Sequence, residues 1–138
     1  KEEKEKRLND MHLERKRGEY YWNAKYHMER MLGGARHFYR ETGRMPDCYQ
    51  ELESTGFLET RYRLMKEWDF ECHWDYARSS RSIIGSITAR STQENPLGEG
   101  HTIRFDILDH EFYQRAPDEP QYKEHRPEEE PSPYRTDN

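Results

Sequence analysis

Apolar residues in the first third of the chain recur every three or four positions. From residue 21 they step by 3, 4, 3, 4 and 3, which places them on one stripe of an α-helix. The members of this stripe are Tyr21, Ala24, Met28, Met31, Ala35 and Phe38. No proline interrupts residues 1–45, and Gly43 is suited to end a helix because it tolerates a positive φ. The pattern predicts a long helix over residues 1–42 whose charged first half has no core to pack on.

Two further segments follow with different patterns. Asp47 and Gln50 have the spacing of a capping box, and Leu52 and Gly56 follow them, which predicts a short helix over residues 47–56. Polar and apolar residues then alternate over nine positions, which is typical of a strand with one buried face. The apolar members of this alternation are Trp68, Phe70, Cys72, Trp74 and Tyr76.

Residues 83–89 and 102–108 predict two more strands, joined through a turn that contains Asn95, Pro96 and two glycines. Short connections between successive strands favour an antiparallel meander. The predicted fold class is therefore α+β. A long N-terminal helix packs on a three- to four-stranded antiparallel sheet over residues 67–113, with the short helix between them.

The last part of the chain has a different composition. Residues 114–138 contain five prolines and seven acidic residues and lack Leu, Ile, Val and Phe. Such a segment cannot bury enough apolar surface to fold alone. We therefore expect one domain over residues 1–113 and a flexible acidic tail over residues 114–138.

Composition limits the size of the core and the kinds of partner. Of the 138 residues 31% are hydrophobic and 37% are charged, but three Trp, ten Tyr and five Phe supply large rings for the interior. The net charge is -5, and no basic stripe is interleaved with aromatic residues. Nucleic acid is therefore not an expected partner.

Candidate catalytic chemistry is scarce. The chain has no G-x-S-x-G elbow and no glycine-rich phosphate loop after a strand, and its seven histidines are scattered without metal-ligand spacing. Acidic residues between positions 106 and 119 carry oxygens that suit calcium, but the glycine-containing EF-hand arrangement is missing. We expect no catalytic residue, no metal site and no cofactor, and hence a protein that is not an enzyme.

Tyr20, Trp22 and Tyr26 fall outside the apolar stripe of the long helix. Two interpretations remain open for them. The three rings either pack on flanking loops or form an interface with neighbouring subunits, where aromatic anchors are enriched.

Residues 35–58 read ARHFYRETGRMPDCYQELESTGFL, and a later segment reads GHTIRFD. This sequence resembles the type IV pilin and type II secretion pseudopilin family, in which a long helix ends in A-x-x-[YF]-[YF]-x-[ED]-x-G. The resemblance covers about residues 21–113. The positions that match in the first segment are Ala35, Phe38, Tyr39, Glu41, Gly43, Pro46, Leu52, Gly56, Phe57 and Leu58.

The resemblance implies a structural subunit of a pilus-like or pseudopilus filament that acts in type II protein secretion or type IV pilus assembly. The chain then corresponds to the soluble domain, without the apolar N-terminal half-helix that anchors such subunits in the bacterial inner membrane. Its partners are other pilin-like subunits, reached through the long helix, and the assembly machinery, with the soluble domain in the periplasm. Lys66-Glu67-Trp68-Asp69 stands where major pseudopilins carry a calcium-associated motif, which favours a minor or atypical subunit.

Cys48 and Cys72 are the only cysteines, and both are placed where they can point into the helix-sheet interface. A bond between them is expected, in part because the family works outside the cytoplasm. The alternative is two separate buried thiols in a cytosolic protein.

A second functional class remains open. The charged first helix also suits a cytosolic adaptor that docks on a partner as a coiled coil.

Overall fold

The computed structural model describes the backbone of residues 2–124 and the side chains of residues 15–123. It confirms the α+β class, with helices first and an antiparallel sheet after them. The elements are α1 (Glu2–Thr42), α2 (Tyr49–Ser54), α3 (Tyr62–Glu67), β1 (Trp68–Ala77), β2 (Ser82–Ser91), β3 (Thr102–Asp106), β4 (Glu111–Arg115) and β5 (Lys123–Glu124).

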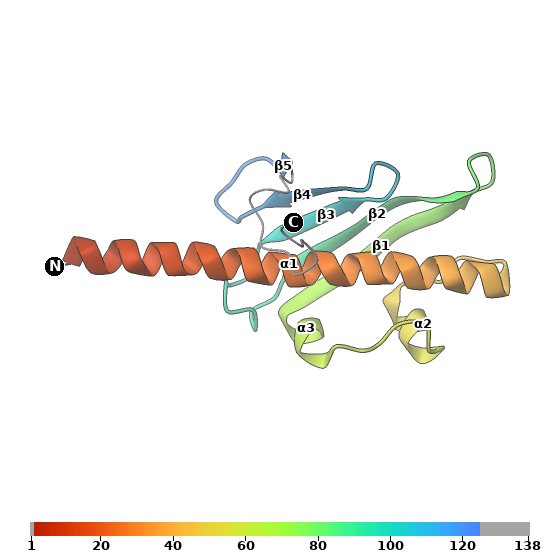
Figure 1. Cartoon of the computed structure of the whole chain (residues 1–138), viewed down its shortest axis with the longest axis horizontal. Coiled ribbons are helices and arrows are strands. Elements are labelled where there is room, and N and C mark those ends of the chain that lie inside the picture. Colours follow the sequence, from red (N-terminus) through yellow and green to blue (C-terminus); the bar gives the residue numbers. More distant parts are fainter. Residues whose placement is uncertain (1, 125–138) are drawn as a thin grey trace, which may run out of the picture.

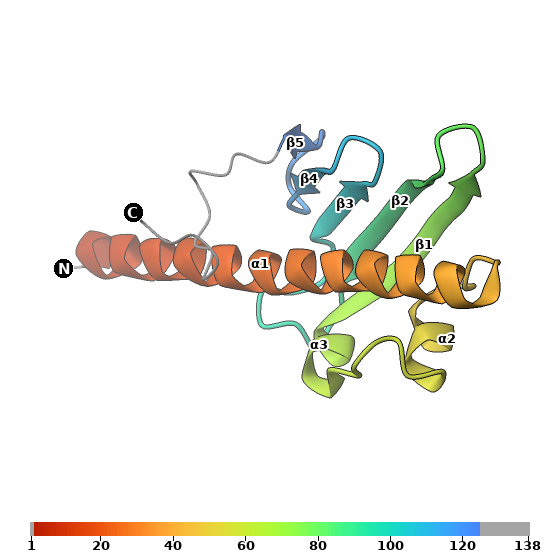
Figure 2. The same ribbon diagram turned by 45° about the vertical axis from the view of Figure 1, so that its right-hand side comes forward.

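The molecule has two layers, the helix α1 and the sheet. Figure 1 shows α1 running along one face of the sheet, with its N-terminal part projecting beyond the strands. In Figure 2 β1 passes behind α1 at an angle, β4 and β5 lie to one side of the helix, and α2 and α3 lie on the other. The helix ends as predicted, because Gly43 adopts a φ of 78° and its N–H donates to the Tyr39 carbonyl at 2.8 Å.

The predicted apolar stripe of α1 is confirmed as the helical side of the core. All six of its side chains are buried, none more than 2% exposed. They pack with Trp68 and Phe70 of β1, Ile87 of β2 and Phe105 of β3 in one hydrophobic cluster. A helix of this composition buries one face because each apolar side chain there gains from leaving water.

The sheet is a simple meander in the order β1-β2-β3-β4-β5, with every neighbouring pair antiparallel. The alternation predicted for β1 is present, since Trp68 and Phe70 are buried and Asp69 is exposed. β3 stops at Asp106, two residues earlier than predicted, because a turn over residues 107–110 leads directly into β4.

The predicted start of the acidic tail is wrong. β4 extends to Arg115, and residues 123–124 pair with it as β5, so the sheet continues ten residues beyond position 114. Glu119 accepts a hydrogen bond from Arg17 of α1 at 2.9 Å and forms an ion pair with Lys123 at 3.2 Å. These contacts hold an otherwise polar segment against the helix. The rest of the predicted tail, residues 125–138, lies outside the described residues.

The short helices also differ from the sequence-based prediction. Asp47 does not cap α2, because the N-cap is Cys48 and makes no side-chain cap bond. Instead Glu51 accepts a hydrogen bond from the Asp47 N–H at 2.9 Å and a second from Arg44 at 2.6 Å. These hydrogen bonds lower the pKa of Glu51 to about 2, and the bond from Arg44 has a larger effect than the bond from the Asp47 N–H. The helix α3 was not predicted.

One histidine is enclosed in the core. His27 of α1 is fully buried with its ring 5.1 Å from that of Phe70, and neither ring nitrogen has a hydrogen-bond partner among the described residues. Burial, together with the positive charges of Arg61 and Arg30, lowers the pKa of His27 to about 4. The histidine is therefore neutral in the folded protein at neutral pH.

We expect this histidine to make folding sensitive to acid. In the unfolded chain its pKa is about 6.5, so below that pH the unfolded state binds a proton that the folded state excludes. The free energy of unfolding should fall by about 3 kcal/mol between pH 6.5 and pH 4, and should be insensitive to this group above pH 7. Urea unfolding at several pH values measures the loss.

The variant His27→Leu should lose less stability over the same pH range than the wild type. His110→Gln serves as its matched control, because His110 is exposed. An identical pH dependence for wild type and His27→Leu would show that His27 does not control the acid sensitivity.

Candidate interaction surface

Two of the three aromatic residues outside the stripe form a pair on α1. The rings of Trp22 and Tyr26 are stacked, with centroids 5.3 Å apart and planes 4° apart. Residues four positions apart on a helix are neighbours on its surface, which explains the pairing. The guanidinium groups of Arg30 and Arg61 lie over the Tyr26 ring, each 5.7 Å from its centroid. Both rings remain partly exposed, so they form an aromatic surface on α1.

Tyr20 lies elsewhere. Tyr20 and Trp22 are two positions apart on the helix, so their side chains face different directions. The Tyr20 side chain packs partly against the core and lines a groove between α1 and α3. The structure therefore brings Trp22 and Tyr26 together and separates Tyr20 from them.

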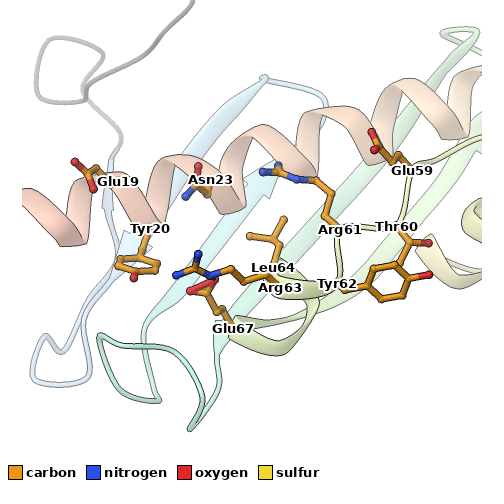
Figure 3. A pocket seen from close by; sticks show the side chains of 10 residues that line it. All are labelled: Glu19, Tyr20, Asn23, Glu59, Thr60, Arg61, Tyr62, Arg63, Leu64 and Glu67. Carbon is orange, nitrogen blue, oxygen red and sulfur yellow. The ribbon is translucent and has the colours of Figure 1, made fainter.

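The groove beside Tyr20 has a volume of about 480 Å³. Figure 3 shows Glu19, Tyr20 and Asn23 of α1 on one side, and the segment that leads into α3 on the other. Side chains from this second wall are mostly polar or charged; they are Glu59, Thr60, Arg61, Tyr62, Arg63, Leu64 and Glu67. Tyr62 is 77% exposed at its rim.

Glu67 is the most unusual residue of the groove. It is only 8% exposed, and its Oε2 atom has no hydrogen-bond partner among the described residues. Its Oε1 atom lies 3.6 Å from Nε of Arg63, a mostly exposed arginine. Burial raises the pKa of Glu67, and the charge of Arg63 opposes this rise. Leaving this buried carboxylate oxygen without a partner costs the free energy of its lost hydration.

The chemistry of the groove is suited to binding. Its lining contains no Ser, Cys or His. Its mixture of carboxylates, guanidinium groups and aromatic rings is instead typical of the polar rim of a protein interface.

Cys48 and Cys72 form a disulfide that joins the N-cap of α2 to the middle of β1, with Cα atoms 5.5 Å apart. Next to it, the indole N–H of Trp74 donates to the Pro46 carbonyl at 2.9 Å. The loop after α1 is therefore fixed to the first strand by one covalent bond and one hydrogen bond.

The sequence pattern missed the wall of the groove that α3 supplies. Leu64 and Trp68 are four residues apart and both buried, and this spacing is the one signal that points to a helical turn there. The helix α3 has only six residues, which are too few to show a helical period, and the alternating pattern of β1 begins directly after it.

Within residues 2–124 no helix is long and apolar enough to cross a membrane. Over the same part of the chain, no three His, Cys, Asp or Glu side chains are grouped so that they could hold a metal ion. No known protein family, curated protein or solved structure matches this chain. Its function must therefore be inferred from its own residues and their geometry.

Proposed function

We propose that this chain is a structural subunit of a pilus-like or pseudopilus filament, and not an enzyme. The observation that carries the proposal is the shape of α1. This helix of 41 residues projects beyond the sheet at its N-terminal end, and it carries a partly exposed aromatic pair, Trp22 and Tyr26 (Figure 1).

A projecting helix is suited to packing against copies of itself. Among the side chains of α1 that the structure describes, those from residue 15 on, the buried members of the core all lie within residues 21–38. Aromatic residues at partly exposed positions are the side chains that most often anchor protein interfaces. The resemblance of residues 35–58 to pilins and pseudopilins supports the same function.

In this proposal the filament acts mechanically. An apolar segment that precedes residue 1 anchors the subunit in the bacterial inner membrane, and the domain described here lies in the periplasm. Added subunits lengthen the fibre, which pushes an exported protein or extends a pilus. The disulfide between Cys48 and Cys72 fits an oxidising compartment such as the periplasm.

The proposal is tested by the variant Trp22→Ala in the protein with its upstream segment. We expect at least a tenfold loss of filament assembly or secretion, about the effect of removing an aromatic anchor from an interface. The free energy of unfolding of the isolated domain should fall by no more than about 1 kcal/mol, the contribution of one aromatic pair. Filament counts or a secretion assay, together with urea unfolding, measure the two effects.

Lys16→Ala is the matched control, because Lys16 is exposed on the same helix. It should leave both assembly and stability unchanged. Sedimentation of the isolated domain separates the proposal from the coiled-coil adaptor. A filament subunit without its apolar segment should be monomeric or weakly associated, whereas an adaptor helix would self-associate or bind a cytosolic partner tightly. A tight oligomer combined with normal assembly of Trp22→Ala would contradict the proposal.

A further inference from the structure

A second cavity is lined by residues from the C-terminal end of α1 and from the hairpin that joins β1 to β2. Figure 1 shows these two parts of the chain at the end of the molecule opposite the N-terminus. Its volume is about 570 Å³, which is within the range of roughly 300–1,000 Å³ found for small-molecule sites. The end of α1 supplies Arg36, Tyr39, Arg40 and Gly43, and the strand side supplies Tyr76, Arg81, Ser82 and Ile83.

Three exposed arginines line this cavity. Over the described residues, no carboxylate forms an ion pair with Arg36, Arg40 or Arg81. Arg36 and Arg40 are one helical turn apart, an arrangement in which like charges repel. The protein as a whole has a net charge of -5, whereas this cluster is positively charged. A bound anion would relieve the repulsion.

The helix dipole does not explain the cluster. Arg40 lies in the last turn of α1, where a positive charge is favourable. Arg81, however, comes from the hairpin, in which it adopts a φ of 52°. This conformation closes the turn between β1 and β2. Arg81 adds a third positive charge to the cavity from a part of the chain that the dipole of α1 does not influence.

The cavity also has an aromatic surface. Tyr39 and Tyr76 both line it, and their rings are stacked with centroids 3.9 Å apart. Ring faces contact planar or apolar groups, and guanidinium forks bind carboxylates and phosphates through paired hydrogen bonds. The arginines come from both walls, so two anionic groups of one ligand can each meet a guanidinium group.

We propose that this cavity binds a ligand that carries at least two carboxylate or phosphate groups on a planar or apolar body. Its anionic groups pair with Arg36, Arg40 and Arg81, and its body packs against the stacked pair of Tyr39 and Tyr76, at the ring edges or on one outer face. The same chemistry is offered by the acidic side chains of an extended peptide and by a free polyanion. This site is independent of the aromatic pair on α1, because at 1.5 Å per residue Arg36 lies about 15 Å along the helix from Tyr26.

The experiment is calorimetric titration of the purified chain at low salt with three separate probes. They are citrate, inorganic pyrophosphate and a synthetic peptide of four glutamates and one tyrosine. We expect at least one probe to bind with a stoichiometry of one. Binding of the peptide alone identifies an acidic peptide as the source of the anionic groups, whereas binding of citrate or pyrophosphate identifies a free polyanion.

Variants then locate the bound ligand. The double variant Arg36→Gln, Arg81→Gln should weaken binding by at least about thirtyfold, because it removes two charge-assisted contacts. Arg90→Gln is the matched control, since Arg90 is exposed on β2 outside the cavity. Its affinity should change less than about threefold, the effect of altering the net charge alone. If the double variant does not fold, as judged by circular dichroism, Arg40→Gln alone replaces it, with an expected loss of about tenfold.

Two results would overturn the inference. One is the absence of binding by all three probes. The other is an equal loss of affinity in Arg90→Gln and in the cavity variants, which would indicate non-specific attraction. Neither result bears on filament assembly, which is tested through Trp22.

Discussion

Replacement of Met31 by aspartate is expected to unfold the domain. Met31 is fully buried in the stripe that α1 packs on the sheet, and an ionised carboxylate there would have neither water nor a positive partner. The expected loss is at least about 4 kcal/mol, a large part of the roughly 5–15 kcal/mol that stabilises a domain. Circular dichroism at 20 °C and a thermal melt measure the result.

Two further variants make this result interpretable. Met31→Ala should remain folded but lose about 2–5 kcal/mol in urea unfolding, because it leaves a cavity. Arg15→Asp introduces the same carboxylate at an exposed position of α1 and should change stability by less than about 0.5 kcal/mol. Equal melting temperatures for Met31→Asp and the wild type would refute the assignment of this stripe to the core.

Reduction of the disulfide is the second large effect that we expect. Cys48 and Cys72 are 24 residues apart, and a covalent bond across a loop of this length restricts the unfolded chain. The loop-entropy model gives about 3–4 kcal/mol of stabilisation. Urea unfolding should therefore show one transition for each form, and the reduced protein should unfold at a lower urea concentration than the oxidised protein.

The double variant Cys48→Ala, Cys72→Ala provides the control, because its unfolding should not respond to the reductant. Thiol titration of the denatured, unreduced wild type should find no free thiol. Two free thiols in protein recovered from an oxidising compartment would contradict the bond.

The long helix and the first strand could be predicted because their patterns are local. A side chain is buried on one face of a helix every three or four residues and on one face of a strand every second residue. The stripe from Tyr21 to Phe38 and the alternation that begins at Trp68 follow these periods directly. Gly43 ends the helix for an equally local reason, its tolerance of a positive φ.

The interaction surface was predicted only in part. The sequence indicated that Tyr20, Trp22 and Tyr26 lie outside the stripe, and a spacing of four already favours contact between the last two. It did not indicate that Tyr20 lines a groove, because the opposite wall belongs to α3. That helix has six residues and begins 42 positions later.

The sequence by itself determined which faces of α1 and β1 are buried, since the free energy gained by burying apolar side chains depends on their period along the chain. Only the tertiary structure decided the fate of residues 115–124, whose acidic, proline-rich composition predicts no order. These residues are held on the domain because Glu119 accepts a hydrogen bond from Arg17, which is 102 residues away in the sequence. In addition, Lys123 and Glu124 pair with the edge of β4. In the same way the sheet brings Arg81 to the cavity beside Arg36 and Arg40. Such contacts depend on how distant segments pack, which no local pattern of residues records.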